Sequence, residues 1–376
     1  IILIKIKSLR SYYLEFPLTN PVITSFGIMK ARPCIIIELE DYDKNIGYGE
    51  IWCNFPSDGA SYRFNLLNNL YLDNIVGHEF SNPEKLIDII TDKFKTLFVQ
   101  SGDIGSFNNI NAGLDCAFWD LFAKIKKTPL NKLLNAQSQS HISVYASGIN
   151  PNEAYDKIKI ARSMGIKAFK IKIGFNHLLD VDLLNLLKGY LSDDEMLMLD
   201  ANQGWAFDEA SNYLKILEDY NFSWIEEPIS ALSNIQELNN IVSLTSCNLA
   251  FGENINNLND FISLGMNNKL KYIQPDLTKY GGISLINILS KKIQTNKIWM
   301  HFLGSGVGLL TSAHIMSAIN PSAFLETDIN VNPLRTNLFK NKLKIEGGKI
   351  NLSKNHGIGE SLDLDTINKY LISSYV

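Results

Sequence analysis

The sequence has few cysteines, and their spacing matches neither a metal site nor a disulfide framework. Four are present among 376 residues, namely Cys34, Cys53, Cys116 and Cys247, and no pair has the Cys-x-x-Cys spacing. Scattered thiols of this kind indicate reduced, mostly structural side chains. We therefore expect a protein of a reducing compartment, the cytoplasm.

Long apolar runs and an excess of positive charge are also missing. No apolar stretch reaches the ~18–20 residues of a membrane span. The first ten residues, IILIKIKSLR, alternate apolar and charged side chains and are too short and too charged for a signal peptide. A formal net charge of -4 offers no basic surface to nucleic acid. We expect neither a membrane nor a nucleic-acid partner, and the composition is ordinary for a soluble globular protein.

Short apolar runs recur between about residues 141 and 328, and many of them end in a charged or polar residue. They read HISVYAS, KAFKIKIG, MLMLDAN, FSWIEEP, NLAFGEN, KYIQPDL, KIWMHFL and SAFLETD. Their spacing of about 25 residues fits a strand, a turn and a helix. The pattern predicts an α/β fold, a TIM-like barrel of seven or eight βα units. In such a barrel the active site lies at the C-terminal ends of the strands.

The chain is longer than one barrel requires. A barrel takes ~250 residues, and most of the surplus lies before residue 140. Residues 1–50 have the pattern of antiparallel strands joined by a loop at Thr19–Lys30, and two amphipathic helices follow before Pro129. We predict an N-terminal α+β capping domain (1–130), a catalytic barrel (131–330) and a C-terminal segment (331–376) that returns to the capping domain.

The second predicted barrel strand, KAFKIKIG, carries two lysines on one face. Alternate strand residues point to opposite sides, so Lys170 and Lys172 face the barrel interior while the apolar residues face the helices. On an isolated strand this pattern is more often a solvated edge, but a barrel strand has no face open to bulk water. Beside one another and a metal, the lysines should have depressed pKa values, so that one can act as a base.

Three carboxylates, Asp200, Glu226 and Glu253, end three successive predicted strands. Neighbouring strands lie ~4.8 Å apart, so these side chains should converge. Without a cation they would raise one another's pKa, whereas oxygen ligands favour Mg²⁺. A single acid is explained by helix capping or a lysine partner, but three on consecutive strands favour a metal site. The strand pattern leaves open whether Glu226 or its neighbour Glu227 faces inward.

An aspartate and a histidine end the next two strands. Asp276 and His301 are placed so that the carboxylate can hold the imidazole and support its protonated form. A lone histidine at a strand end is more often structural, but the neighbouring aspartate favours a base. Glu326 ends the eighth strand and would donate a hydrogen bond as a neutral acid if its pKa is raised.

Three further features carry weaker signals. Lys279 lies in the turn after Asp276, where a structural or supporting role is favoured over that of a base. His314 stands at helical spacing among apolar residues and is expected in the core. The glycine-rich GSGVG at residues 304–308 follows the seventh strand, where barrels often bind phosphate, but one such turn is weak support.

With these residues placed, the chain resembles the enolase superfamily, and within it the mandelate racemase subgroup. The resemblance covers nearly the whole length, and its motifs are KIKIG, LDANQ, WIEEP, FGEN, PDLTKYGG, the His301 strand end and Leu325–Glu326. It implies that Asp200, Glu226 and Glu253 bind Mg²⁺.

The same resemblance implies the roles of the remaining site residues. Lys172 would be one general base and the His301–Asp276 pair the other. Lys170 would neutralise the substrate carboxylate, and Glu326 would hydrogen-bond it. Asn202, Phe26 and Trp52 are expected to contact the substrate, and a homo-oligomer, from dimer to octamer, is expected.

The implied activity is Mg²⁺-dependent abstraction of the α-proton of a small-molecule carboxylate through a metal-stabilised enediolate. We expect dehydration or epimerisation of a hydroxy or sugar acid. A racemase or epimerase of an amino-acid-like carboxylate is the alternative, because the predicted capping loops, at residues 18–30 and 51–59, are rather apolar for a polyol. A barrel that binds a ligand without catalysis is a third hypothesis.

Overall fold

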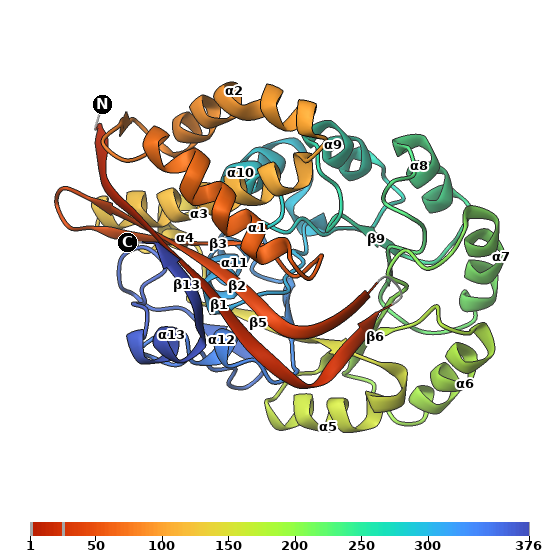
Figure 1. The fold of residues 1–376 in the computed structure, drawn as a ribbon. Helices are drawn as coiled ribbons and strands as arrows, with labels where there is room; N and C mark the ends of the chain where they lie inside the picture. The colour runs from red at the N-terminus through yellow and green to blue at the C-terminus, as the bar shows by residue number, and fades with distance from the viewer. Residues whose placement is uncertain (1–2, 25–26, 376) are drawn as a thin grey trace.

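Two sheets organise the protein, whose computed structural model describes residues 3–24 and 27–375. In the described part of the chain, one sheet is antiparallel with the strand order β13-β1-β2-β3, and β4 pairs with β1. The other sheet is parallel and curled, with the order β10-β9-β8-β7-β6-β5-β11. The first belongs to the capping domain and the second to the barrel, as Figure 1 shows. The predicted combination of a barrel with an α+β cap is therefore confirmed.

The capping domain is built on a long hairpin that crosses the front of the barrel in Figure 1. Its strands are β1 (Ile4–Thr24), β2 (Gly27–Asp41), β3 (Ile46–Ile51) and β4 (Glu79–Phe80). Its helices are α1 (Gly59–Leu66), α2 (Pro83–Ser101), α3 (Ile104–Ile125) and α4 (Leu130–Leu134), with a π-helical turn at Leu67–Tyr71 and a 3₁₀ turn at Leu72–Asn74.

The predicted loop at Thr19–Lys30 is wrong for most of its length. Strand pairing continues to the hairpin tip, where Val22 pairs with Met29 and Thr24 with Gly27. The β-branched residues in VIT (residues 22–24) favour extended backbone, and they outweigh the turn signal of the Asn and Pro before them. The hairpin is therefore long enough to reach the barrel.

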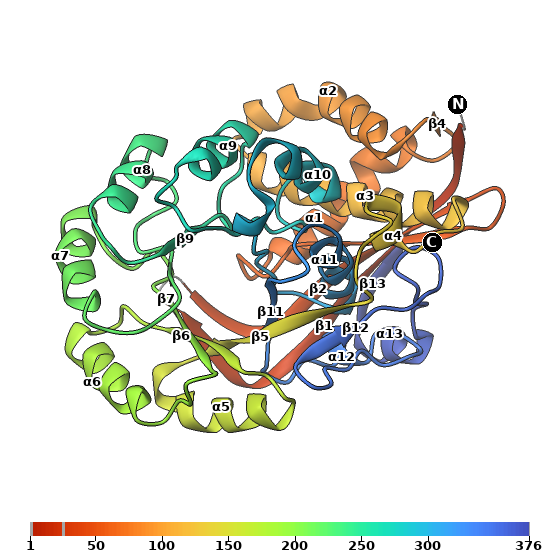
Figure 2. The same ribbon diagram turned by 180° about the vertical axis from the view of Figure 1, so that it is seen from behind.

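The barrel alternates strands and helices as predicted. Its strands are β5 (His141–Ile149), β6 (Ala168–Lys172), β7 (Met196–Asp200), β8 (Ile225–Glu226), β9 (Leu249–Phe251), β10 (Tyr272–Ile273) and β11 (Phe324–Asp328). Its helices are α5 (Ala154–Ser163), α6 (His177–Lys188), α7 (Phe207–Leu217), α8 (Ile235–Ser243), α9 (Leu258–Met266), α10 (Gly282–Lys292) and α11 (Gly306–Ile319), with 3₁₀ turns at Pro151–Glu153 and Thr295–Lys297. Helices α5 to α9 form an outer arc in Figure 2.

The seventh predicted strand, near residues 297–301, is not a regular strand. In the described chain it pairs with β10 only at the bridge between Ile273 and Ile298. The Trp299 N–H donates to the Ile273 carbonyl at 2.9 Å, whereas the Ile298 carbonyl accepts from the Asn320 side chain at 3.1 Å. A side-chain hydrogen bond thus takes the place of a backbone hydrogen bond between strands at this position. The parallel sheet is a curled one.

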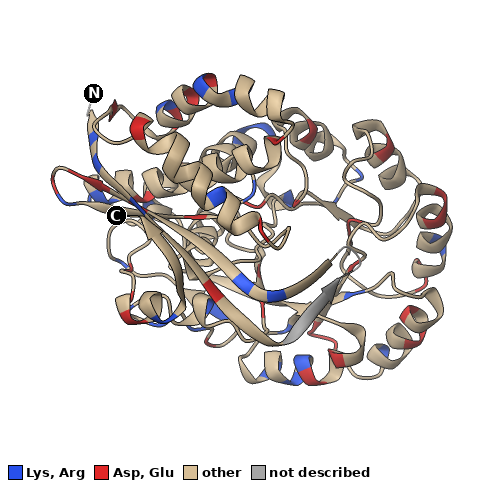
Figure 3. Ribbon diagram, viewed as in Figure 1, with Lys and Arg blue, Asp and Glu red and all other residues tan. Residues whose placement is uncertain are grey.

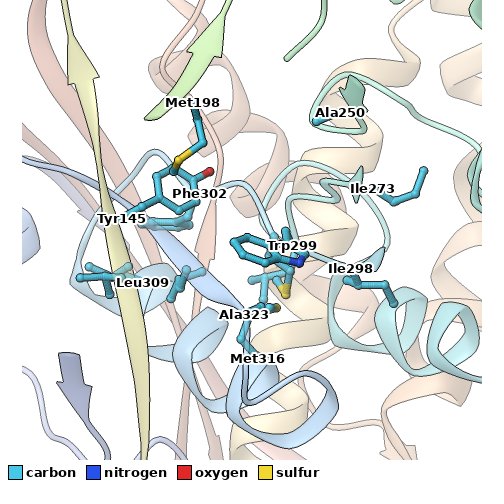
Figure 4. Close-up of a cluster of buried hydrophobic side chains, with 14 of the residues drawn as sticks. Tyr145, Met198, Ala250, Ile273, Ile298, Trp299, Phe302, Leu309, Met316 and Ala323 are labelled. Atoms are coloured by element: carbon cyan, nitrogen blue, oxygen red, sulfur yellow. The ribbon is translucent and has the colours of Figure 1, made fainter. Parts of the chain in front are cut away.

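Aromatic side chains fill the interior of the barrel below the strand ends. The Trp224 ring lies 4.7 Å from that of Tyr272 and 5.2 Å from that of Trp299, between centroids. In Figure 4, Trp299 lies in the middle of this cluster, between Phe302 and Ile298. Because the interior is packed, the polar strand ends can form a cavity only at the mouth of the barrel.

The C-terminal segment contacts both sheets. It contains α12 (Pro333–Thr336), β12 (Lys349–Asn351), α13 (Leu364–Tyr370) and β13 (Leu371–Tyr375). Strand β12 pairs with β5 of the barrel, and β13 pairs with β1 of the cap. The segment therefore reaches the capping domain, while the exact domain boundaries remain predictions.

Three further features concern the thiols, the apolar helices and the distribution of charge. All four cysteines are free thiols. None of the helices in the described chain is long and apolar enough to cross a membrane. Each of the outer helices α5, α6 and α7 carries both acidic and basic residues, as Figure 3 shows.

Candidate active site

A cavity of about 610 Å³ lies between the capping domain and the C-terminal ends of the barrel strands. The predicted site residues that line it are Lys170, Lys172, Asp200, Asn202, Glu253, His301, Glu326 and Trp52. Glu226 and Asp276 are buried behind this lining, with exposed fractions of 1% and 2%. Phe26 lies outside the described residues. Nearly all residues that were singled out along the sequence are thus brought to one place.

Lys170 is buried among carboxylates. Its Nζ lies 2.7 Å from Glu226 Oε2, 2.7 Å from Glu326 Oε1 and 3.9 Å from Asp200 Oδ2. Burial acts to lower the pKa of Lys170, but Glu226 and Glu326 outweigh it and hold the pKa well above its usual value. The nearest charged neighbours of Lys170 in this arrangement are acids, so the depression expected of a lysine beside a metal stays a prediction.

Lys172 is the accessible lysine of the pair. Its side chain is 22% exposed, against 2% for Lys170, so a ligand in the cavity can reach it. Its Nζ lies 3.2 Å from Asp200 Oδ2 and also hydrogen-bonds Asn202 Oδ1. Asn202 has φ of 45°, a left-handed conformation that asparagine tolerates. This turn places the amide beside the amine.

His301 and Asp276 form the predicted pair. His301 Nδ1 lies 2.8 Å from Asp276 Oδ2, and Asp276 Oδ1 accepts from the N–H and hydroxyl of Thr278 at 2.8 and 2.7 Å. The Nε2 side faces Glu253 at 3.1 Å. Burial acts to lower the pKa of His301, but Glu253, Glu326 and Asp276 outweigh it and raise the pKa to about 10.

The three predicted metal ligands stand on neighbouring strand ends. Asp200 on β7 pairs with Glu226 on β8, and Glu253 follows β9. Burial, together with the charges of Asp200, Glu326 and Glu253, raises the pKa of Glu226 to about 7 despite Lys170. A divalent cation would relieve this crowding, and a donor set of oxygens alone fits Mg²⁺.

The same carboxylates are ion-paired with protein cations in this arrangement. Among the described residues, no group of three or more His, Cys, Asp or Glu side chains is arranged to hold a metal ion. Asp200 and Glu226 turn toward the two lysines, and Glu253 turns toward His301 and Lys279. Burial opposes ionisation of Glu253, but His301 and Lys279 hold its pKa well below the usual range. Metal binding by this set therefore stays a prediction.

Glu226 and Glu227 have different surroundings. Glu226 Oε2 accepts from Gln274 Nε2 at 2.7 Å as well as from Lys170. Glu227 has φ of 39° and accepts from Asn254 Nδ2 at 2.7 Å. Burial and Glu253 raise the pKa of Glu227 to about 8. The left-handed backbone at Glu227 turns this second acid away from Lys170. Strand alternation alone did not decide which of the two glutamates faces inward.

Some residues around the site were not predicted. The Tyr145 hydroxyl donates to Glu326 Oε2 at 2.9 Å, and Lys170 lies 5.7 Å from the centre of its ring. Glu326 thus accepts a hydrogen bond from Tyr145, and its expected role as a donor to the substrate stays a prediction. A tyrosine at an interior position of the first barrel strand is the signal that could have found Tyr145. Arg32, from β2, also lines the cavity.

Lys279 lies closer to the site than a purely structural residue would. Its Nζ is 3.3 Å from Glu253 Oε2, 2.7 Å from Asn254 Oδ1 and 4.8 Å from the centre of the Trp52 ring. It therefore joins the barrel to Trp52 of the cap. This position agrees with the supporting role that was favoured.

The glycine-rich GSGVG segment forms the start of α11, and a protein carboxylate occupies its N–H groups. Glu50 accepts from the Ser305 N–H at 2.7 Å, the Ser305 hydroxyl at 2.6 Å and the Gly308 N–H at 2.7 Å. Burial raises the pKa of Glu50 to about 7 in spite of these donors. The N-terminus of α11 thus binds Glu50 of the capping domain, at the position where phosphate binding was considered.

Two family models match the chain. The model described as mandelate racemase / muconate lactonizing enzyme, N-terminal domain, matches residues 10–135, and the enolase C-terminal domain-like model matches residues 153–366. A crystal structure of a mandelate racemase/muconate lactonizing enzyme from Bordetella bronchiseptica is 30% identical, with a TM-score of 0.88, over 98% of this chain and 100% of that one. An enolase from Bradyrhizobium, complexed with magnesium and mandelic acid, is 23% identical with a TM-score of 0.83, over 99% and 100%.

Curated relatives carry out related reactions. Arabinonate dehydratase of Saccharolobus solfataricus is 25% identical over 98% of this chain and 100% of its own. L-talarate/galactarate dehydratase of Salmonella typhimurium is 28% identical over 77% and 71%. N-succinyl-L-Arg/Lys racemase of Bacillus cereus is 24% identical over 98% and 98%. These names support an enzyme of the lyase or isomerase type, and a barrel without catalysis is not supported. The chain belongs to the enolase superfamily, in its mandelate racemase subgroup.

Proposed function

We propose that the enzyme removes the proton α to the carboxylate of a hydroxy or sugar acid and then dehydrates or epimerises it. One observation carries this proposal: Lys172 on β6 and His301 in the segment beside β10 line the same cavity, and β7, β8 and β9 lie between β6 and β10 in the sheet. Two proton-transfer groups can therefore approach a bound acid from different sides. General acid–base catalysis requires such groups within hydrogen-bond reach of the reacting proton.

The chemical steps follow from these positions. Lys172 Nζ takes the α-proton, and the electrons of the broken C–H bond pass into the carboxylate to give an enediolate. If His301 Nε2 then protonates the opposite face of the same carbon, the product is the epimer. If His301 instead gives its proton to a β-hydroxyl, that group leaves as water, and the resulting enol becomes a 2-keto-3-deoxy acid.

Positive charge must stabilise the enediolate. Lys170, held by Glu226 and Glu326, places a fixed cation at the cavity wall. Preorganised charge of this kind is usually the largest catalytic contribution. Asp200, Glu226 and Glu253 would hold Mg²⁺, which when bound neutralises charge on the substrate carboxylate.

A racemase of amino-acid-like carboxylates is a second candidate. Part of the cap side of the cavity is apolar, with Phe16, Leu18 and Met29 in its lining. Such a wall suits an N-acyl or alkyl group better than a polyol. The Bacillus cereus relative is named as a racemase of substrates of this kind.

The test is proton NMR of a carboxylate library incubated with enzyme and Mg²⁺ in D₂O. The library contains aldonic and aldaric acids, N-acyl amino acids, proline derivatives and aryl hydroxy acids. Deuterium at the α-position without loss of the acid supports racemisation or epimerisation, and a 2-keto-3-deoxy product supports dehydration. Absence of exchange from every acid, with no binding of Mg²⁺ by calorimetry, would contradict the proposal.

A further inference from the structure

A second cationic centre, apart from Lys170, lines the same cavity. Arg32, on β2, lines the cavity with only 5% of its surface exposed. Its guanidinium lies 2.9 Å from Asp328 Oδ2, at the end of β11. In the described part of the chain, Arg32 Nε and Asp328 Oδ2 have no hydrogen-bond partner. The pair is thus close in space but poorly aligned, and a buried donor remains unused.

Asp328 is shared between two guanidinium groups. Arg335 on α12 lies 3.6 Å from the same Oδ2, and its own exposed fraction is 6%. The other oxygen, Oδ1, accepts from the N–H and side-chain amide of Asn330, at 2.9 and 2.7 Å. One carboxylate therefore balances two buried arginines.

The other charged residues near Arg32 do not balance the excess positive charge of the two arginines. Lys157 also lines the cavity and hydrogen-bonds Asn330 at 2.6 Å, while Glu153 accepts from Asn150 at 3.3 Å. Counting Glu153 and Asp328 against Lys157 and the two arginines leaves one positive charge. A buried charge and an unused donor both cost free energy unless a ligand satisfies them.

The spacing along β11 relates this centre to the proposed reaction site. Glu326, which holds Lys170, and Asp328, which holds Arg32, are two residues apart and face the same side. Two residues of a strand span ~7 Å. With C–C bonds of about 1.5 Å in zigzag, that distance corresponds to about five or six bonds, a chain of about six or seven carbons.

We propose that Arg32 forms a second carboxylate-binding subsite, and that the substrate is a short dicarboxylic acid. The reacting carboxylate lies at the Lys170 end, and the distal carboxylate accepts hydrogen bonds from Arg32. This inference rests on the proposed function for the identity of the reacting end. A distal hydroxyl would satisfy the unused donor but would leave the positive charge unbalanced.

The experiment measures binding rather than turnover, so that it is independent of the chemistry. Lys172→Ala serves as the background, and calorimetry with Mg²⁺ gives Kd for galactarate against galactonate and for glucarate against gluconate. Within each pair the acids differ only at the distal carbon, a carboxylate or a hydroxymethyl group. Charged hydrogen bonds should make at least one aldarate bind roughly ten- to a hundredfold tighter than its aldonate.

Adding Arg32→Gln should reduce that ratio to within about twofold by weakening only the dicarboxylate. Arg162→Gln is the matched control, because Arg162 pairs with Glu195 away from the cavity, and it should leave the ratio unchanged. Equal affinities in the background protein, or an unchanged ratio in Arg32→Gln, would overturn the proposal.

Two further variants keep the subsite testable if Arg32→Gln loses binding only because it misfolds. Arg32→Lys keeps the charge without the planar fork, so an intermediate ratio is expected. Asp328→Asn frees both guanidiniums, so the preference for the dicarboxylate should increase, and a decrease would contradict the subsite. If α-proton exchange fails in D₂O while the binding preference persists, the subsite stands and the proposed reaction is wrong.

Discussion

Lys170 and Lys172 share one face of β6 but have different surroundings. Lys170 is enclosed by Glu226 and Glu326, whereas Lys172 meets Asp200 and Asn202 at the edge of the cavity. A lysine enclosed by acids is held in its charged form, while one at the cavity edge can exchange a proton with a ligand. The division of labour between the two follows from their neighbours rather than from their residue type.

Replacing either proposed proton-transfer group should abolish α-proton exchange at one face of the substrate and leave it at the other. In Lys172→Ala, α-deuterium exchange should stop for one stereoisomer and persist for the other, and His301→Asn should show the reverse. Overall turnover should fall roughly 10²- to 10⁴-fold in each. NMR in D₂O with each stereoisomer measures both rates.

The control for these variants is Lys167→Ala. Lys167 precedes the same strand, pairs with Asp194 and is 62% exposed, so its loss should change neither rate. Full activity in both Lys172→Ala and His301→Asn would show that neither residue transfers the proton.

The alternation of residues along a strand was sufficient to predict which face of the strand each side chain occupies, but not which residues it contacts. The inward direction of both lysines was predicted, and so was the proximity of Asp276 to His301. Arg32 and Gln274 were missed because a strand pattern gives no information on which distant residue completes a contact. The carboxylates around Lys170 raise its pKa although burial acts to lower it, because the identity of the nearest charges decides the sign of the net shift.

At the scale of elements, α11 connects the barrel to the cap through its first turn. Glu50 of β3 enters this turn and accepts three hydrogen bonds from Ser305 and Gly308. Carboxylates at helix N-termini are favoured by the helix dipole and by unpaired N–H groups. The close approach depends on Gly308, since a Cβ there would lie 2.8 Å from Glu50 Oε2 and 2.4 Å from the Phe302 ring.

Gly308→Ala should therefore destabilise the protein by roughly 1–3 kcal/mol, the usual cost of overpacking. Gly105→Ala in α3 is the matched control, because within the described residues nothing lies within 4 Å of its Cβ position. That change should be neutral or stabilise by up to about 1 kcal/mol. Urea unfolding of both variants measures the difference, and equal stability would show that the glycine has no packing role.

The succession of elements in the barrel was predictable because its signal is local. The starts of β5, β6, β7, β9, β10 and β11 fall within about three residues of the apolar runs, inside the error expected of element boundaries. The seventh strand and the hairpin tip were not predicted correctly. Each depends on pairing with a remote partner, the Asn320 side chain in one case and Met29 across the hairpin in the other.

At the scale of the whole molecule, the C-terminal segment holds cap and barrel together. Strand β13 pairs with β1, β12 pairs with β5, and the carbonyl of Ile358 accepts from His314 of α11 at 3.1 Å. Motifs in the sequence indicated that this segment returns to the cap. Its attachments to the barrel, through β12 and through His314, had no such signal, because each depends on a contact with a remote residue.

His314 should make the stability of the whole protein sensitive to acid. Burial lowers its pKa from 6.5 to about 4, with Ile358 opposing only in part. The neutral ring satisfies both nitrogens, since Nδ1 accepts from the Asn131 N–H at 3.3 Å. Between pH 6.5 and about 4 the unfolded chain binds a proton that the folded chain does not, so stability falls as pH falls through this window.

The His314→Gln variant should lose this part of the pH dependence, because glutamine can donate to Ile358 without titrating. At about 1.36 kcal/mol per pKa unit, the contribution amounts to about 3 kcal/mol across the window. Urea unfolding at pH 7 and at pH 4.5 should therefore show a smaller loss in His314→Gln than in the wild type. His356→Gln, at an exposed position of the same C-terminal segment, should keep the wild-type loss. If the curves of the wild type and His314→Gln run parallel, the ring is not neutral in the folded protein, and the attachment must tolerate the charged form.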